Sequence, residues 1–331
     1  MSLSARERMQ ACIQEDPALD RPPVALWRHF PVDDQSPDTL AAATLDFQRH
    51  YAFDLVKVTP ASSFSIKDWG AEDAWEGHTE GTRRYTRRVI QKPQDWERLP
   101  LLDPSHAAHL AAQIACLRQI RSGLGADVPL LQTIFSPLAQ AKNLAGGDLL
   151  IVHLRKYPEA VRKGLETIAT STRRFVEAAM QTGIDGIFYA IQHAQAGLLT
   201  LEEYRSFGLP SDLESIGPAA GLWCNLLHLH GLEVYFDLVR DLSVLFAIVN
   251  WHDRETWPSL AEARASGLPQ VLCGGISQKT IVYADAGQVR LEATDAICQT
   301  GGRRLLLGTG CVVPVIAPHG NLLAAKYGYL F

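Results

Sequence analysis

Short apolar runs recur along the chain, and each is followed by a polar or small residue before a stretch of mixed polarity begins. Near-continuous apolar runs of this length are typical of strands in a parallel sheet that is buried on both faces. Eight such runs are present: PVALWRHF (23–30), FDLVKVTP (53–60), PLLQTIFSP (129–137), GIFYAIQHA (186–194), LWCNLLHLHG (222–231), SVLFAIVNWH (243–252), PQVLCGGIS (269–277) and RLLLGTGC (304–311).

Helical patterns lie between several of these runs. Residues 36–52 open with Ser36 as a predicted N-cap and Pro37 in the first turn. Residues 157–183 repeat apolar positions on one helical face and stop at a glycine, and residues 286–302 also end in glycines. Strand and helix therefore alternate along the chain.

This alternation predicts an α/β fold, a (β/α)8 TIM barrel that forms one domain over residues 1–331. The active site is then expected at the C-terminal ends of the strands. A doubly wound open sheet is the alternative, but its phosphate-binding pattern GxGxxG does not follow the first run. Two connections, 61–100 and 193–220, are too long for plain turns, and we expect both to be lid-type loops at the mouth.

Composition narrows the class of protein. The chain has 331 residues, a formal net charge of -5 and no long basic stretch, so neither nucleic acid nor a membrane surface is the expected partner. No apolar run is long enough for a transmembrane helix, and the N-terminus lacks the apolar region of a signal peptide. The six cysteines form no CxxC pair, which predicts a reduced, cytoplasmic protein. The expected partner is a small-molecule substrate.

Polar residues gather at the ends of the apolar runs, where a barrel would present them at its mouth. Lys57 is the most informative, because a lysine inside an apolar strand must find a partner or reach a cavity. We expect Lys57, Arg28 and His193 to act in catalysis. The predicted substrate-binding residues are Arg28, Lys57, Gln192, Asn250 and Tyr189. The competing explanation is that strand ends are wetter than strand middles in any protein.

His228 and His230 stand two apart in LLHLHG, so on a strand they point to the same side. Cys311 ends the last run, across the predicted mouth, and closure of the barrel would bring its sulfur near the two imidazoles. Imidazole nitrogen and thiolate sulfur are ligands of zinc. We therefore predict a metal site of His228, His230 and Cys311, with Cys273 as a weaker fourth candidate. The alternative is one inward histidine that hydrogen-bonds a carboxylate, with its partner at the rim.

The order and spacing of these segments resemble the uroporphyrinogen decarboxylase superfamily over almost the whole chain. This superfamily contains the haem-pathway decarboxylase and zinc-dependent methyltransferases that move methyl groups between corrinoid proteins and thiols. RPPVALWRHFP is similar to the decarboxylase's N-terminal Arg-Pro-Pro-Val segment, and FDLVKVTP to its second strand. LRKYPEAVRKGLETI, LLHLHG, CGGIS and LLLGTGCVVP are similar to later elements in the family's order. The resemblance also implies a (β/α)8 barrel.

Two branches of the superfamily differ at residues that can be compared here. The decarboxylase has two arginines after Pro-Pro-Val, of which only Arg28 matches, and Ala61 stands at its strand-two aspartate. Its Gly-His-Gly reads Gly308-Thr309-Gly310. The methyltransferase metal motif, His-x-Cys-Gly followed by a distant Gly-Cys, is closer to His228-Leu229-His230-Gly231 and Gly310-Cys311. The one departure is His230 in place of cysteine, which keeps a ligand type but removes a thiolate.

The resemblance thus implies a zinc-dependent methyltransferase, with a corrinoid carried by a partner protein as the expected methyl source. Arg28 and Lys57 would fix an anionic part of the substrate. A metal-free decarboxylase of uroporphyrinogen or a related carboxylated substrate is the second hypothesis. A non-catalytic small-molecule binding barrel is the third. The sequence leaves open which substrate is used and whether the chain forms a homodimer.

Overall fold

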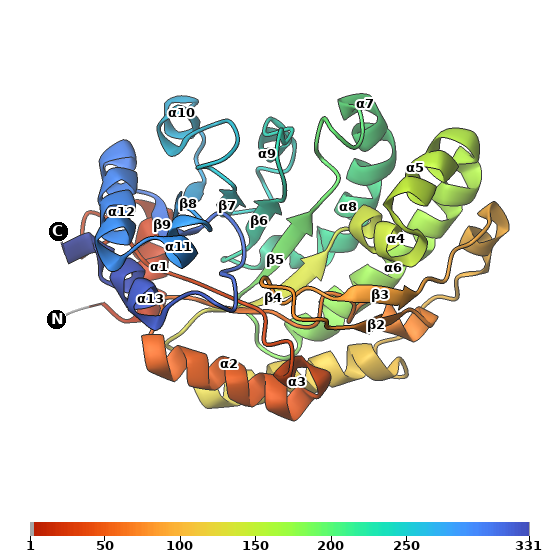
Figure 1. Ribbon diagram of the computed structural model, residues 1–331, viewed down its shortest axis with the longest axis horizontal. Helices are drawn as coiled ribbons and strands as arrows, with labels where there is room; N and C mark the ends of the chain where they lie inside the picture. Colours follow the sequence, from red (N-terminus) through yellow and green to blue (C-terminus); the bar gives the residue numbers. More distant parts are fainter. Residues whose placement is uncertain (1–2, 331) are drawn as a thin grey trace.

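A parallel sheet runs through the centre of the computed structural model, which describes residues 3–330. Its strands follow chain order, and the sheet curves while helices cover its outer side (Figure 1). The seven strands are β1 (Val56–Val58), β4 (Leu130–Phe135), β5 (Gly186–Ile191), β6 (Leu226–Leu229), β7 (Ile248–Trp251), β8 (Val271–Ile276) and β9 (Leu305–Thr309).

The first apolar run does not form a regular strand. Residues 23–27 are extended and make one parallel bridge, between Val24 and Leu307 of β9. The Ala25 amide donates to the Leu307 carbonyl at 3.0 Å, and the Asp54 amide donates to the Val24 carbonyl at 2.8 Å. Pro22 and Pro23 lack amide hydrogens, so this segment cannot build a full ladder.

Seven of the eight predicted strands are therefore confirmed, in a curled half-barrel sheet, while a full eight-stranded barrel is not. The extended segment bridges directly to β9, one edge strand of the sheet. It also contacts Asp54, which lies just before β1, the other edge strand. Residues 1, 2 and 331, at the ends of the predicted domain, lie outside the described residues.

The three helices predicted from patterns all form. In α2 (Pro37–Tyr51), the Ser36 hydroxyl oxygen accepts a hydrogen bond from the Thr39 amide at 3.2 Å, as expected of an N-cap. Helix α6 (Pro158–Met180) ends shortly before Gly183, and α12 (Ala286–Thr300) ends at the left-handed residue Gly301. The other helices are α1 (Ala5–Gln14), α3 (Ala108–Leu124), α4 (Pro137–Ala145), α5 (Gly147–Lys156), α7 (Leu201–Glu203), α8 (Leu209–Ile216), α9 (Leu238–Asp241), α10 (Leu260–Ala265), α11 (Thr280–Tyr283) and α13 (His319–Lys326).

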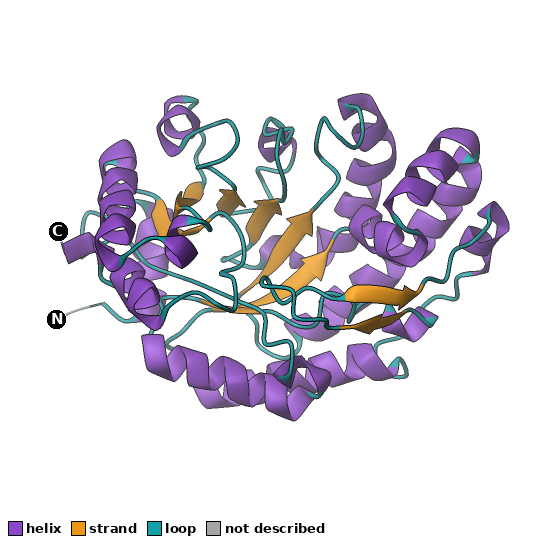
Figure 2. Cartoon of the chain, viewed as in Figure 1, coloured by secondary structure: helices purple, strands orange, loops and turns teal. Residues whose placement is uncertain are grey.

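The two long connections differ from each other. Residues 61–100 carry an antiparallel hairpin of β2 (Glu72–Ala74) and β3 (Arg84–Arg87), which lies apart from the main sheet in Figure 2. Residues 193–220, expected to be a loop, are mostly helical from Leu201 onward, through α7, a π-helical turn and α8. No helix among residues 3–330 is long and apolar enough to cross a membrane.

Candidate metal centre and cavity

The C-terminal ends of several strands open into one cavity of about 570 Å³. A volume of this size holds a single small molecule. Six of the residues predicted for the site line it: Lys57, Gln192, His193, His228, His230 and Cys311. Polar residues at the ends of several strands therefore line one common cavity, as the apolar runs predicted.

Three predicted metal ligands face one another at one end of the cavity. His228 Nε2 lies 3.4 Å from His230 Nδ1, and Cys311 Sγ lies 3.6 Å from His228 Nε2 and 3.5 Å from His230 Nδ1. Around a tetrahedral zinc with bonds of about 2.0–2.1 Å to nitrogen and about 2.3 Å to sulfur, neighbouring ligands stand about 3.3–3.6 Å apart. The three donor atoms therefore have the spacing that a zinc ion requires.

A fourth donor, His252, comes from the residue after β7. The ligand atoms of His228, His230, His252 and Cys311 all lie within 4.8 Å of one another. The buried Nε2 of His252 has no hydrogen-bond partner among the described residues. Sequence reasoning placed His252 at a strand end but not among the ligands. The register that pairs His228 with Asn250 brings His252 level with His230.

Cys273, the weaker candidate for a fourth ligand, does not join this group. Its side chain is fully buried in β8, one strand beyond β7, and it does not line the cavity. Its carbonyl oxygen instead accepts a hydrogen bond from Asn250. His252 therefore takes the place that was expected for Cys273.

The His228 ring is held on two sides. Its Nδ1 lies 2.7 Å from Asn250 Oδ1, and its face stacks on Phe188 with ring centroids 5.2 Å apart. Asn250 was predicted to bind substrate, but it is fully buried behind His228 and does not line the cavity. Its side chain therefore contacts His228 and does not reach a molecule bound in the cavity.

Burial sets the protonation states of the four donors. It lowers the pKa of His228 well below its ordinary value and that of His230 to about 4, and it also lowers the pKa of His252. The imidazoles are therefore neutral at pH 7, as metal ligands must be. Burial also raises the pKa of the Cys311 thiol to about 12, so a nearby cation is needed to hold it as a thiolate.

Lys57 reaches the cavity, as its position in β1 predicted. Its Nζ donates to Thr59 Oγ1 at 3.2 Å and lies 4.5 Å from the centroid of the Phe188 ring. Its side chain is buried, and burial lowers the pKa of the amine to about 7. Lys57 and His228 therefore both contact Phe188, one as a cation on the ring and one by stacking.

Sequence reasoning missed a second cationic region of the cavity. Lys142 of α4 and Arg88 after β3 both line it, and Arg88 Nη1 donates to the carbonyls of Lys142 and Asn143 at 3.1 and 2.8 Å. The buried His193 Nδ1 has no partner among the described residues, and burial lowers the pKa of His193 to about 3, with a smaller effect of Lys142. Arg87 and Arg88 form one of two adjacent arginine pairs in the 61–100 connection, which is a signal visible in the sequence, but nothing in the sequence marked Lys142.

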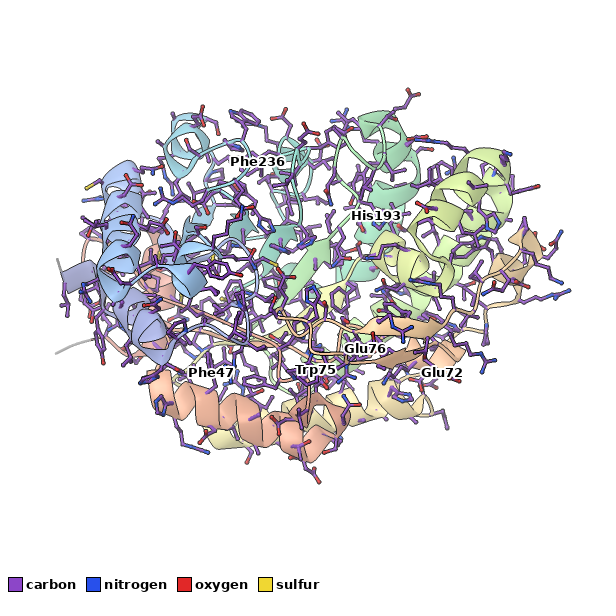
Figure 3. All side chains as sticks on the ribbon, in the orientation of Figure 1. Phe47, Glu72, Trp75, Glu76, His193 and Phe236 are labelled. Atoms are coloured by element: carbon purple, nitrogen blue, oxygen red, sulfur yellow. The ribbon has the colours of Figure 1, made fainter. Side chains whose placement is uncertain are left out.

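Arg28 and Tyr189 lie outside this cavity, contrary to expectation. The Arg28 guanidinium sits over the rings of Phe30 and Phe47, 5.2 and 5.5 Å from their centroids, in a groove along α2. Figure 3 labels Phe47 and His193 in clearly separate parts of the molecule. Tyr189 is fully buried and its hydroxyl donates to Asp212 Oδ1 at 2.6 Å. Phe188 and Ala190 line the cavity, so the residue between them points to the other face of the strand.

Comparison with known proteins places the chain in a family. Residues 17–325 match the model of the family Uroporphyrinogen decarboxylase (URO-D), so the chain belongs to that family. No curated protein matches the chain. A methyltransferase from Methanosarcina mazei has a similar structure, with 17% sequence identity, a TM-score of 0.81 and coverage of 99% of this chain and 98% of that one.

A B12-independent methionine synthase from Shewanella is more distantly similar in structure. Its identity is 15% and its TM-score 0.55, and the match covers 94% of this chain and 92% of that one. At these identities the two likenesses establish a shared fold. Together with the family match, they agree with the resemblance found in the sequence.

Proposed function

We propose that this chain is a methyltransferase-type enzyme that binds zinc through His228, His230 and Cys311, with His252 at the fourth corner. The observation that carries the proposal is the spacing of 3.4, 3.6 and 3.5 Å among the first three donor atoms, at the end of a cavity large enough for a substrate. Zinc held there lowers the pKa of a coordinated substrate donor, so that a nucleophile is available at neutral pH.

His252 is the ligand that we expect to give way to the substrate. His228 is fixed by Asn250 and Phe188, whereas His252 Nε2 makes no hydrogen bond among the described residues. Four protein ligands fill a tetrahedral zinc site, and a catalytic site needs an open position. With one thiolate and neutral imidazoles, the site keeps a net charge of +1 (2 − 1), so the acceptor need not be a thiol.

The cationic lining indicates an anionic substrate. Glu80 is the only acid among the described lining residues, whereas Lys57, Lys142 and Arg88 bring cationic groups. Lys142 and Lys57 therefore take the anion-binding role that Arg28 was expected to share. A corrinoid is much larger than the substrate cavity, so a corrinoid on a partner protein would deliver its methyl group from above the mouth.

The test combines metal analysis with methyl transfer from methylcobalamin to a panel of thiol and oxygen acceptors. We expect zinc in the purified protein, and loss of both zinc and transfer in Cys311→Ala and His228→Ala. Cys298→Ala is the matched control, because Cys298 is an exposed free cysteine away from the cavity. Full transfer by metal-free protein would overturn the proposal. Conversion of uroporphyrinogen that survives loss of Cys311 would favour the decarboxylase, and binding without turnover a binding protein.

The role of Lys142 has its own test. Lys142→Met is expected to raise the KM for an anionic acceptor about tenfold, because one charge-assisted contact is lost. Arg28→Met is the control, and its KM should stay at the wild-type value because Arg28 lies in the α2 groove. An equal rise in both variants would show that the anion is not bound at the Lys142 side of the cavity.

A further inference from the structure

Asn250 is a fully buried asparagine on β7, and its side chain hydrogen-bonds two backbone carbonyls and the His228 ring. Its amide Nδ2 donates to the carbonyl oxygens of Cys273 at 2.9 Å and Thr309 at 3.1 Å. Both acceptors are backbone atoms, which can only accept. The orientation of the Asn250 amide is therefore determined, and its Oδ1 faces His228.

This orientation selects one tautomer of His228. Because Asn250 Oδ1 can only accept, the ring nitrogen 2.7 Å away, Nδ1, must carry the hydrogen. In a neutral imidazole the other nitrogen, Nε2, then holds a free lone pair. Nε2 is the atom that faces Cys311 and His230.

We propose that Asn250 is a positioning residue that presents the His228 Nε2 lone pair to the metal and holds it at the correct distance from Cys311. This inference rests on the proposed function for its zinc ion, but its core, the tautomer and placement of His228, can be tested without metal. Asn250, which the sequence predicted to bind substrate, instead organises the side chains that would bind the metal. Residues that hydrogen-bond a metal-binding side chain in this way orient it and strengthen metal binding.

Asn250 also connects the two strands that carry ligands far apart in the sequence. It lies on β7, it accepts from His228 on β6, and it donates to the carbonyl of Thr309 on β9, two residues before Cys311. The Thr309 hydroxyl in turn donates to the Cys311 carbonyl. A single side chain thus ties the strand of His228 to the turn of Cys311, which are 83 residues apart.

Asn225 provides a matched control for a purely structural role. It is also buried, its Nδ2 donates to the carbonyls of Ala219 and Leu245 at 2.7 and 3.0 Å, and its Oδ1 accepts from the Ile187 amide at 3.0 Å. Asn225→Leu therefore removes two donated hydrogen bonds and one accepted one, as Asn250→Leu does. None of the partners of Asn225 is a metal ligand or lines the cavity.

The experiment measures zinc affinity by competition with a chromophoric chelator in wild type, Asn250→Leu, Asn250→Asp and Asn225→Leu. We expect Asn250→Leu to lose about 10–100-fold in zinc affinity, and Asn225→Leu to keep the wild-type affinity even where it lowers the unfolding temperature. Asn250→Asp should retain more affinity than Asn250→Leu, because one carboxyl oxygen still accepts from Nδ1, although the two hydrogen bonds donated to carbonyls are weakened or lost. Equal losses in Asn250→Leu and Asn225→Leu, or no loss in either, would overturn the proposal.

A second measurement decides the question if a leucine variant does not fold. The ¹⁵N chemical shifts of the His228 ring in zinc-free wild-type protein distinguish the two neutral tautomers. We expect hydrogen on Nδ1, and a ring that carries it on Nε2 would overturn the proposal. If wild type binds no zinc, the proposed function fails, whereas the tautomer of His228 still tests the role of Asn250.

Discussion

Lys57 places an ammonium group in the interior of the protein, where it contacts a hydroxyl group and the face of an aromatic ring. Its Nζ donates to Thr59 Oγ1, and its charge lies over Phe188. Both contacts are weaker than an ion pair, so they do not offset the loss of hydration, and burial lowers the pKa of the amine from 10.5 to about 7. A buried lysine without an acidic partner binds an anion readily, and it lowers the folding stability of the protein when no anion is bound.

This state of Lys57 makes stability depend on pH. Below pH 7 the amine is charged in both the folded and the unfolded chain, and the full cost of burying it is present. Between pH 7 and 10.5 only the unfolded chain holds the proton, so the wild type becomes more stable as the pH rises. We expect Lys57→Met to stabilise zinc-free protein more at pH 6 than at pH 9, by up to about 2.5 kcal/mol.

Chemical denaturation of chelator-treated protein at the two pH values measures this difference. Lys163→Met is the control, because the side chain of Lys163 is 63% exposed and pairs with Glu166 on the surface. It should show no gain that depends on pH. A gain from Lys57→Met that is the same at pH 6 and pH 9 would mean that the Lys57 amine titrates in its ordinary range.

The β2–β3 hairpin of the 61–100 connection forms part of the cavity wall. Glu80, Thr82, Arg83 and Tyr85, on or beside the hairpin, line the cavity. Arg83 anchors the hairpin, since its guanidinium contacts Asp34 at 2.5 Å and Asp73 at 3.4 Å. All three side chains are at most 5% exposed, so each charge depends on the others.

Replacing Arg83 should therefore loosen the hairpin. Arg83→Met leaves the buried Asp34 without its cation and leaves Asp73 with Lys67 alone, and loss of one partner from a buried pair costs about 3–5 kcal/mol. We expect faster tryptic cleavage after Arg87 and Arg88, a lower unfolding temperature and a higher KM. In the control Arg84→Met, only an exposed surface pair with Glu76 is lost, and such pairs contribute little to stability. Equal cleavage rates in the two variants would show that Arg83 does not anchor the hairpin.

Most elements could be predicted from the apolar runs, and the failures have local causes. The first run became an extended segment because two prolines remove amide donors at its start. The 193–220 connection was expected to be a lid-type loop because it is too long for a plain turn. It contains Gly208 and Pro210, which are residues that usually interrupt helices. In the structure a π-helical turn over Tyr204–Gly208 precedes α8, and Pro210 falls in the first turn of that helix, where its missing amide hydrogen does no harm.

The candidate site was predictable where one strand or one motif carried the information. HxH on a strand and the distant Gly-Cys brought His228, His230 and Cys311 together in the prediction, and the structure places them in contact. His252 and Lys142 depend instead on the register between β6 and β7 and on the packing of α4. Side chains alternate between the two faces of β5, so Tyr189 could be excluded from the cavity once Phe188 and Ala190 were known to line it.

Curvature of the whole sheet brings the ligands into one place. His228 lies on β6 and His230 directly follows it, His252 follows β7 and Cys311 follows β9, so a bound cation would join the C-terminal ends of three strands. Such a cation binds the folded chain and not the unfolded one. It should therefore stabilise the entire molecule, and not only the residues around it.

Removal of metal is accordingly expected to lower the unfolding temperature of the full chain. With free zinc at about 1,000 times its dissociation constant the stabilisation is about 4 kcal/mol, which corresponds to a shift of roughly 5 °C. Thermal unfolding with chelator, and again after zinc is restored, measures this shift. Cys298→Ala should keep the shift and Cys311→Ala should lose most of it, because only Cys311 contacts the other ligands. A chelator-induced shift that persists in full in Cys311→Ala would show that Cys311 is not needed to hold the stabilising metal, because His228, His230 and His252 still offer three imidazole donors in that variant.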